Sequence, residues 1–328
     1  MKNFRFLIAL AIVLLAVAPA FAKPVTIKFS HVVAVDTPKG QSAEYFKKLV
    51  KERSDGTIEV EIYPNASLYG DREAVEALSM NALQMAAPSF SKFTGFTPQL
   101  QLFDLPFLFD DADHLHRVLD GEVGKEILQM VGKKGLVGMA YWDNGFKQIS
   151  ANKPLIKPSD AAGLKFRIMS SKVLEAQFKA IGANPQVLPF SEVYSALQQG
   201  VVDGQENTLS NIYTKKFHEV QSDLTLSNHG YLGYMVVTNK IFWNKLNDEQ
   251  RKIIKGAMKD ATEYAREKAA ELNNSNLEKI RNSGKISIHE LTNEQRLVWK
   301  KRMMNIYPEF HDVIGRDLIE GALDASTQ

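Results

Sequence analysis

A long helical stripe in the C-terminal part of the chain most constrains the fold. Asn247, followed by Asp248 and Glu249, is a strong N-cap with an acidic first turn. Apolar residues then recur at helical spacing: Ile253, Ile254, Ala257, Met258, Ala261, Ala265, Ala269, Leu272, Leu277 and Ile280. At 1.5 Å per residue the helix would reach about 50 Å, which exceeds one small domain. We therefore expect it to straddle two domains, with its weak point at the polar run NNSN, 273–276.

Upstream of this stripe, strand and helix patterns alternate. The period-2, β-branched segments 25–31 and 57–64 flank a helix whose inward face is Ala43, Phe46, Leu49 and Val50. The alternation resumes between 163 and 207, after a Gly-, Asn- and Pro-containing segment at 143–160. This order predicts α/β domains with largely parallel sheets, and it suggests that segment 143–160 crosses between them.

The N-terminal 22 residues have the pattern of a secretory signal peptide. Lys2 and Arg5 precede an apolar run, and Ala20-Phe21-Ala22 forms a small-x-small cleavage site. The run is shorter than the ~20 residues that a membrane-spanning helix needs. We expect cleavage after Ala22, a mature chain of 328 − 22 = 306 residues, and export to the periplasm.

Charge and cysteine content restrict the function further. Removing Lys2 and Arg5 leaves 38 basic residues against 38 acidic ones, and no long basic run remains, which argues against a nucleic-acid partner. The sequence has no cysteine, so disulfides, thiol nucleophiles and thiolate metal sites are excluded. About 300 residues bury enough surface to fold without such crosslinks.

No catalytic, nucleotide or metal motif specifies an enzyme. The sequence lacks G-x-S-x-G, G-x-x-x-x-G-K-[ST], G-x-G-x-x-G and H-E-x-x-H. His114 and His116 are two residues apart, on different sides of a helix, so we interpret them as solvated surface histidines. The acidic run 109–114 lacks the glycine and glutamate of a calcium loop and indicates helix capping. No cofactor is expected.

Arg167 is the strongest candidate for binding chemistry. It lies in the strand-like GLKFRI, 163–168, between two apolar residues, and a guanidinium cannot be buried there without a partner. One possibility is an internal carboxylate, with Asp143, Asp203 or Glu206 as candidates. The other is the carboxylate of a ligand, which the planar fork would hold through two parallel bonds in a crevice at the strand ends.

Several longer stretches resemble one family of binding proteins. These are KFSHVVAVDTPKG, FDLPFLFDD, GLKFRIMSS, FSEVYSALQQGVVDGQENTLSNIYTKKFHEVQ and YMVVTNKIFW. They are similar to the solute-binding receptors of the tripartite ATP-independent periplasmic (TRAP) transporters, and most similar to the C4-dicarboxylate receptors. The resemblance covers essentially the whole mature chain.

The resemblance implies a fold and a division into lobes. It implies a two-lobed α/β periplasmic binding protein of the type II kind, with a cleft between the lobes and a long interdomain helix. The expected division is a signal peptide at 1–22, lobe I at 23–146 plus 233–272, and lobe II at 147–232 plus 273–328. Hinge closure over the ligand would be the signal read by the membrane subunits. A monomer is the family expectation.

The resemblance also implies the ligand-binding residues. Arg167 corresponds to the family's main carboxylate clamp, and Asn207, in DGQEN, to an amide that helps to hold the same group. Lys147 stands where many relatives have arginine, and Lys39 is a second source of positive charge for a dianion. Without the resemblance, both lysines would be interpreted as solvated cations.

Five further residues complete the predicted site. Ser89 stands where relatives have a polar contact, and His31 is either a ligand contact or a core or capping histidine. Met169 lies two residues after Arg167, so it would share its side of the strand and form an apolar wall. His229 and Tyr234 are included from their location.

The function predicted is therefore an extracytoplasmic receptor that binds malate, succinate or fumarate and delivers it to TRAP membrane subunits. The alternative is a secreted α/β enzyme acting on a small organic acid, with Arg167 as anchor and Glu206 or His31 as base. A sensing module would have the same sequence features.

Overall fold

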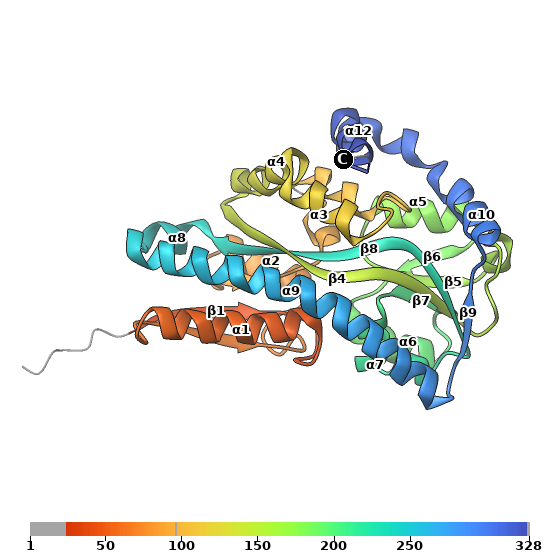
Figure 1. Cartoon of the computed structure of the whole chain (residues 1–328), viewed down its shortest axis with the longest axis horizontal. Coiled ribbons are helices and arrows are strands. Elements are labelled where there is room, and N and C mark those ends of the chain that lie inside the picture. The colour runs from red at the N-terminus through yellow and green to blue at the C-terminus, as the bar shows by residue number, and fades with distance from the viewer. Residues whose placement is uncertain (1–23, 96, 327–328) are drawn as a thin grey trace, which may run out of the picture.

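The computed structural model describes residues 24–95 and 97–326, which form a mixed sheet covered by helices (Figure 1). The strands are β1 (Val25–Ser30), β2 (Ile58–Tyr63), β3 (Met85–Ala86), β4 (Leu136–Ala151), β5 (Lys165–Ile168), β6 (Asn184–Val187), β7 (Gly204–Asn207), β8 (Asp223–Asn239) and β9 (Ser287–Glu290). The predicted signal peptide lies outside the described residues. Within them, no helix has the length and apolarity needed to cross a membrane.

The α-helices differ widely in length. They are α1 (Pro38–Arg53), α2 (Asp71–Ser79), α3 (Ala112–Asp120), α4 (Glu122–Met130), α5 (Lys172–Ala180), α6 (Val193–Gln198), α7 (Leu209–Thr214), α8 (Lys240–Lys245), α9 (Asp248–Ser283), α10 (Asn293–Met304), α11 (His311–Ile314) and α12 (Arg316–Asp324). Short 3-10 helices are η1 (Phe90–Phe93), η2 (Pro98–Asp104), η3 (Val131–Lys134), η4 (Pro158–Ala161), η5 (Phe190–Glu192), η6 (Phe217–Glu219) and η7 (Tyr307–Phe310).

The sheet is parallel at its two ends and antiparallel in the middle. Its order is β2-β1-β3-β8-β4-β7-β5-β6, with β9 beside β8. β1 runs parallel to β2 and β3, and β5 runs parallel to β6 and β7, as the alternation of strands and helices predicts. β4 and β8 pair antiparallel with each other and with their other neighbours β7 and β3. The expectation of largely parallel sheets is thus wrong for the centre, where two long strands join the parallel halves.

β4 and β8 carry the two predicted strand crossings between lobes. Much of the segment 143–160, expected as an irregular crossing, is strand up to Ala151. Phe146 lies opposite Tyr231 and Lys147 opposite Gly230, so the two crossings are adjacent. The register shifts nearby, between Asp143 and Gly145, and Gly145 has a φ of 118°, which favours glycine.

α9 is one continuous helix of 36 residues, about 54 Å long, that runs past α1 at one end and α7 at the other (Figure 1). Asn247 and Gln250 form a capping box at its start, and Gly284 ends it in the left-handed conformation. The NNSN run does not break it. The Asn273 side chain bonds to neighbouring segments, donating to Asn144 O at 2.7 Å and accepting from Ser210 N at 3.0 Å.

Candidate functional site

A cavity of about 310 Å³ lies between segments that belong to the two predicted lobes. Lobe I segments contribute Val32, Val33, Ala66, Gly70, Asp71, Arg72, Glu73, Ser89, Lys92 and Tyr234. Lobe II segments contribute Arg167, Met169, Ser170, Val187, Leu188, Pro189, Phe190, Ser191, Asn207, Asn211 and Leu232. The lining mixes apolar walls with a few polar groups, as in small-molecule sites.

Arg167 lies on β5 and lines this cavity with only 2% of its surface exposed. Its Nε and Nη2 both donate to Leu188 O, at 3.1 and 2.9 Å. A guanidinium has five N–H groups, so Nη1 and one Nη2 hydrogen remain as an end-on fork. Burial lowers the pKa of Arg167 to about 10, so the side chain stays cationic at neutral pH. The backbone carbonyl therefore fixes the fork without neutralising it.

The three carboxylates proposed as internal partners of Arg167 bind elsewhere. Asp143 contacts His116 Nε2 at 2.6 Å and accepts from Tyr231, and Asp203 accepts from Lys165 N. Glu206 pairs with Lys147. In the part of the chain that the structure describes, no carboxylate lies within ion-pair distance of Arg167, so none of the three candidates is its partner.

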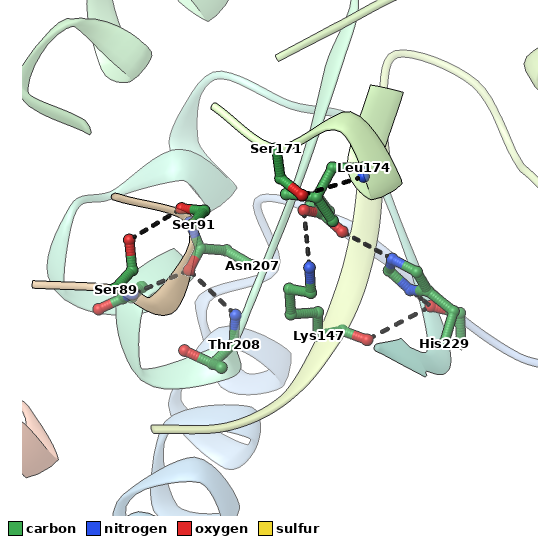
Figure 2. A network of polar contacts seen from close by, with 11 residues as sticks. Ser89, Ser91, Lys147, Ser171, Leu174, Asn207, Thr208 and His229 are labelled. Carbon is green, nitrogen blue, oxygen red and sulfur yellow. Dashed lines mark hydrogen bonds and ion pairs between the residues drawn. The ribbon is translucent and has the colours of Figure 1, made fainter. Parts of the chain in front are cut away.

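Asn207 ends β7 beside Arg167's strand and also lines the cavity. Its Oδ1 accepts from Thr208 N at 3.1 Å and from Asn211 Nδ2 at 2.8 Å (Figure 2). Both bonds use the oxygen, and within the described residues the Nδ2 donor makes no hydrogen bond, so it is available to donate to a carboxylate oxygen.

Three more predicted residues line the same cavity. Ser89 lies opposite Tyr234 in an antiparallel bridge, and its hydroxyl contacts that of Ser91 at 3.1 Å. Tyr234 presents a buried ring, and Met169 supplies the apolar wall beside Arg167. Five of the nine predicted residues thus come together, from segments far apart in the sequence.

Lys39 and His31 are buried but are not part of the lining. Lys39 Nζ donates to Ala87 O at 2.8 Å and lies 3.5 Å from the centre of the Tyr234 ring. Burial lowers the pKa of Lys39 to about 8. Burial, together with the charge of Lys39, lowers the pKa of His31 to about 3, so the imidazole is neutral. Lys39 therefore supports Tyr234 in this structure.

Lys147 and His229 form a buried network away from the lining (Figure 2). Lys147 Nζ lies 2.8 Å from Glu206 Oε1, and His229 Nε2 lies 2.9 Å from Glu206 Oε2. Burial opposes ionisation of Glu206, but Lys147 and His229 outweigh it and hold its pKa at about 2. The charge of Lys147 is thus neutralised internally.

Lys92 is a cavity residue that the sequence analysis missed. It lies in η1, three residues after Ser89, and its Nζ is 3.4 Å from Ser170 Oγ. Burial is the main cause that lowers its pKa, and the charge of Arg167 contributes. The sequence does contain one signal for Lys92: it lies in the Phe-rich segment FSKF, which directly follows the predicted contact Ser89.

The prediction of two solvated histidines is wrong, while the capping prediction is confirmed. His116 is half-buried, and its Nε2 lies 2.6 Å from the buried Asp143 carboxylate. Asp111 caps α3, with its side chain accepting from His114 N at 2.8 Å, as predicted. His114 is not a surface residue: it is buried, and its Nε2 contacts Ala322 O at 2.7 Å. Across the described ranges, no group of three or more His, Cys, Asp and Glu residues is placed to hold a metal ion.

The fold and the cavity define a two-lobed ligand-binding protein. The description "Bacterial extracellular solute-binding protein, family 7" matches residues 29–312. The C4-dicarboxylate-binding periplasmic protein DctP of Rhodobacter capsulatus is 49% identical over 320 residues, which covers 97% of this chain and 96% of the relative.

Two solved structures show the same fold. One is a TRAP periplasmic solute binding protein from Sulfurospirillum deleyianum with bound succinate: 57% identity, TM-score 0.89, covering 92% of this chain and 99% of that one. The other, from Pseudomonas aeruginosa with bound L-malate, is 44% identical, with a TM-score of 0.85 and coverage of 87% and 100%. The chain belongs to this family of TRAP solute-binding proteins.

Membership confirms the predicted α/β fold and the predicted class of function. The family and its close relatives are solute-binding proteins, so the enzyme alternative is not supported. The residues considered as bases agree with this outcome, because Glu206 is held in an ion pair and His31 does not line the cavity.

Proposed function

We propose that this receptor binds a C4-dicarboxylate, malate, succinate or fumarate, in the cavity and delivers it to the membrane subunits of a TRAP transporter. The observation that carries the proposal is the buried guanidinium of Arg167, which lines the cavity and has no carboxylate partner in the described chain. The succinate and L-malate in the two similar structures support the same class of ligand.

Each cavity residue has a proposed role. Arg167 holds one carboxylate through the end-on fork, and Asn207 Nδ2 donates to the same group. Ser89 supplies a hydroxyl, while Met169 and Tyr234 form walls that exclude water and so strengthen the charge contacts. The other four predicted residues lie behind the lining and support it. Lys39 packs against the ring of Tyr234, and Lys147 and His229 belong to the buried network of Glu206. His31 is buried behind the lining as well.

The division into lobes at 146/147, 232/233 and 272/273 stays part of the proposal. Gly145 lies opposite Leu232, and Asn273 bonds to Asn144, so the three proposed boundaries would lie close together, near the middle of β4 and β8 and beside them on α9. Three adjacent crossings form a natural hinge for closure. Export with cleavage after Ala22, and a monomeric receptor, complete the proposal; N-terminal sequencing and light scattering test them.

The function is tested by calorimetric titration of the mature protein with succinate, fumarate and malate, and with butyrate as a C4 monoacid. The diacids should bind and raise the melting temperature by mass action, and butyrate should do so weakly. NMR spectra of the acids after incubation with the protein should show that they are chemically unchanged. Failure of all three diacids to bind would reject the proposal.

A further inference from the structure

A bound dianion needs a second cation, and neither lysine predicted for that role is placed to serve. Lys147 is neutralised by Glu206 at 2.8 Å. Lys39 lies outside the lining, with its ammonium on a backbone carbonyl and under the Tyr234 ring. A succinate held at one end by Arg167 would leave its second carboxylate desolvated without a charge partner, which is costly.

Lys92 has the position that the other two lack. It lines the cavity together with Arg167, but it comes from η1, in a lobe I segment, whereas Arg167 comes from β5 in lobe II. Within the described residues its Nζ has one hydrogen bond, a long one of 3.4 Å to Ser170 Oγ, and no carboxylate within ion-pair distance. An ammonium has three donors, so Lys92, which lines the cavity, retains unused donors.

The electrostatics fit an anion between the two cations. Arg167 and Lys92 are close enough for the charge of Arg167 to lower the pKa of Lys92. Asp71 also lines the cavity and raises the pKa of Lys92 by more than Arg167 lowers it, but it lies at the N-terminus of α2 and, among the described residues, makes no ion pair with either cation. Neither Lys92 nor Arg167 has an ion-pair partner in the described chain, and the two carboxylates of a dianion would supply one to each.

We propose that Lys92 binds the second carboxylate of the ligand held by Arg167, and that it thereby sets the preference for diacids over monoacids. This proposal rests on the proposed function. It adds a consequence for closure: because the two cations come from different lobes, one dianion ties the lobes together through both of its ends. A monoacid engages Arg167 but leaves Lys92, the cation of lobe I, without a carboxylate partner.

The test compares Lys92→Met with Lys92→Arg and with wild type by calorimetry, using succinate and butyrate. Lys92→Met keeps the length of the side chain and removes its charge. We expect succinate affinity to fall by at least about 10-fold, as for loss of a partly desolvated charge contact, with little change for butyrate. Lys92→Arg should restore much of the difference between the two acids.

Two controls separate loss of the proposed Lys92 contact from a general effect of removing a lysine and from misfolding. Lys172→Met removes an exposed lysine paired with Glu175 near the same region and should change neither affinity. The melting temperature of each ligand-free variant reports folding. Wild-type succinate affinity in folded Lys92→Met, or equal losses for succinate and butyrate, would overturn the role of Lys92 while leaving the proposed function intact. Absence of succinate binding by wild type would overturn both.

Discussion

Asn273 Nδ2 donates to Asn144 O at 2.7 Å and so fixes the long helix to the central strand β4 beside Gly145. A Cβ at position 145 would lie 2.7 Å from that same Nδ2. The φ of 118° at Gly145 favours glycine, and a larger residue would also have to displace the Asn273 amide that joins α9 to β4 where the predicted boundaries between lobes meet. If the lobes close as proposed, residues at this junction are expected to absorb the motion, while Arg167 and Asn207 keep their places on the parallel strands β5 and β7.

Arg167→Lys should leave the fold intact and weaken binding of both diacids and monoacids by about 10- to 100-fold. One ammonium can replace the charge, but it cannot keep the bond to Leu188 O and hold a carboxylate through a planar fork. Calorimetry with succinate and butyrate measures the loss. Wild-type affinity in this variant would remove Arg167 from the site.

Glu206→Gln should destabilise the protein by about 3 kcal/mol, because it leaves Lys147 buried without its ion-pair partner. Chemical denaturation gives the free energy of unfolding. Glu320→Gln is the matched control, since Glu320 pairs with Arg316 on the surface at 3.9 Å and should contribute little. Equal stability of the two variants would contradict the structural role given to Lys147 and Glu206.

The sequence predicts the residues that line the cavity better than it predicts the contacts of the residues behind them. Arg167 and Asn207 are recognisable because their strand-end motifs are local and specific. The ion-pair partner of Lys147 cannot be recognised in this way. Glu206 is on β7, 59 residues away, and only the pairing of β4 with β7 brings the two side chains together. Lys92 lies in a short 3-10 turn, which has no periodicity to mark its inward side.

The long helix illustrates the same limit at the level of the fold. Its apolar stripe and capping residues predict its start and extent correctly, since these signals are local. NNSN was interpreted as a weak point because asparagine favours turns. The structure retains the helix there, as Asn273 bonds to Asn144 and Ser210 on other segments. The sequence alone does not show such tertiary partners.

Asp104 should make stability depend on pH between about 4 and 6. It is buried, its Oδ2 has no hydrogen-bond partner among the described residues, and burial raises its pKa from 3.8 to about 6. Between these values the folded state binds more protons than the unfolded state, so stability falls as the pH rises, and the whole cost is present above about 6. That cost is at most about 3 kcal/mol.

Asp104→Asn removes this titration. The variant should be more stable relative to wild type at pH 7 than at pH 4, where the wild-type carboxyl is largely protonated in the folded state. Urea denaturation of both proteins at the two pH values gives the comparison. A stability difference that is the same at pH 4 and pH 7 would show that Asp104 does not titrate in this way.

Lys215 should slow release of the ligand. Its Nζ donates to Asn65 Oδ1 at 3.1 Å and lies 5.5 Å from the centre of the Phe190 ring, which lines the cavity. Lys215 follows α7 in lobe II, and Asn65 follows β2 in lobe I, so the bond joins the predicted lobes beside the cavity. Opening of the proposed lobes must break this bond.

A hydrogen bond to a charged group contributes about 1.5 kcal/mol, so Lys215→Met should raise the dissociation rate by roughly 10-fold. Stopped-flow displacement of succinate measures this rate, and Lys240→Met, at an exposed position on α8, is the control. Equal dissociation rates for Lys215→Met and wild type would mean that the contact does not hold the cavity closed.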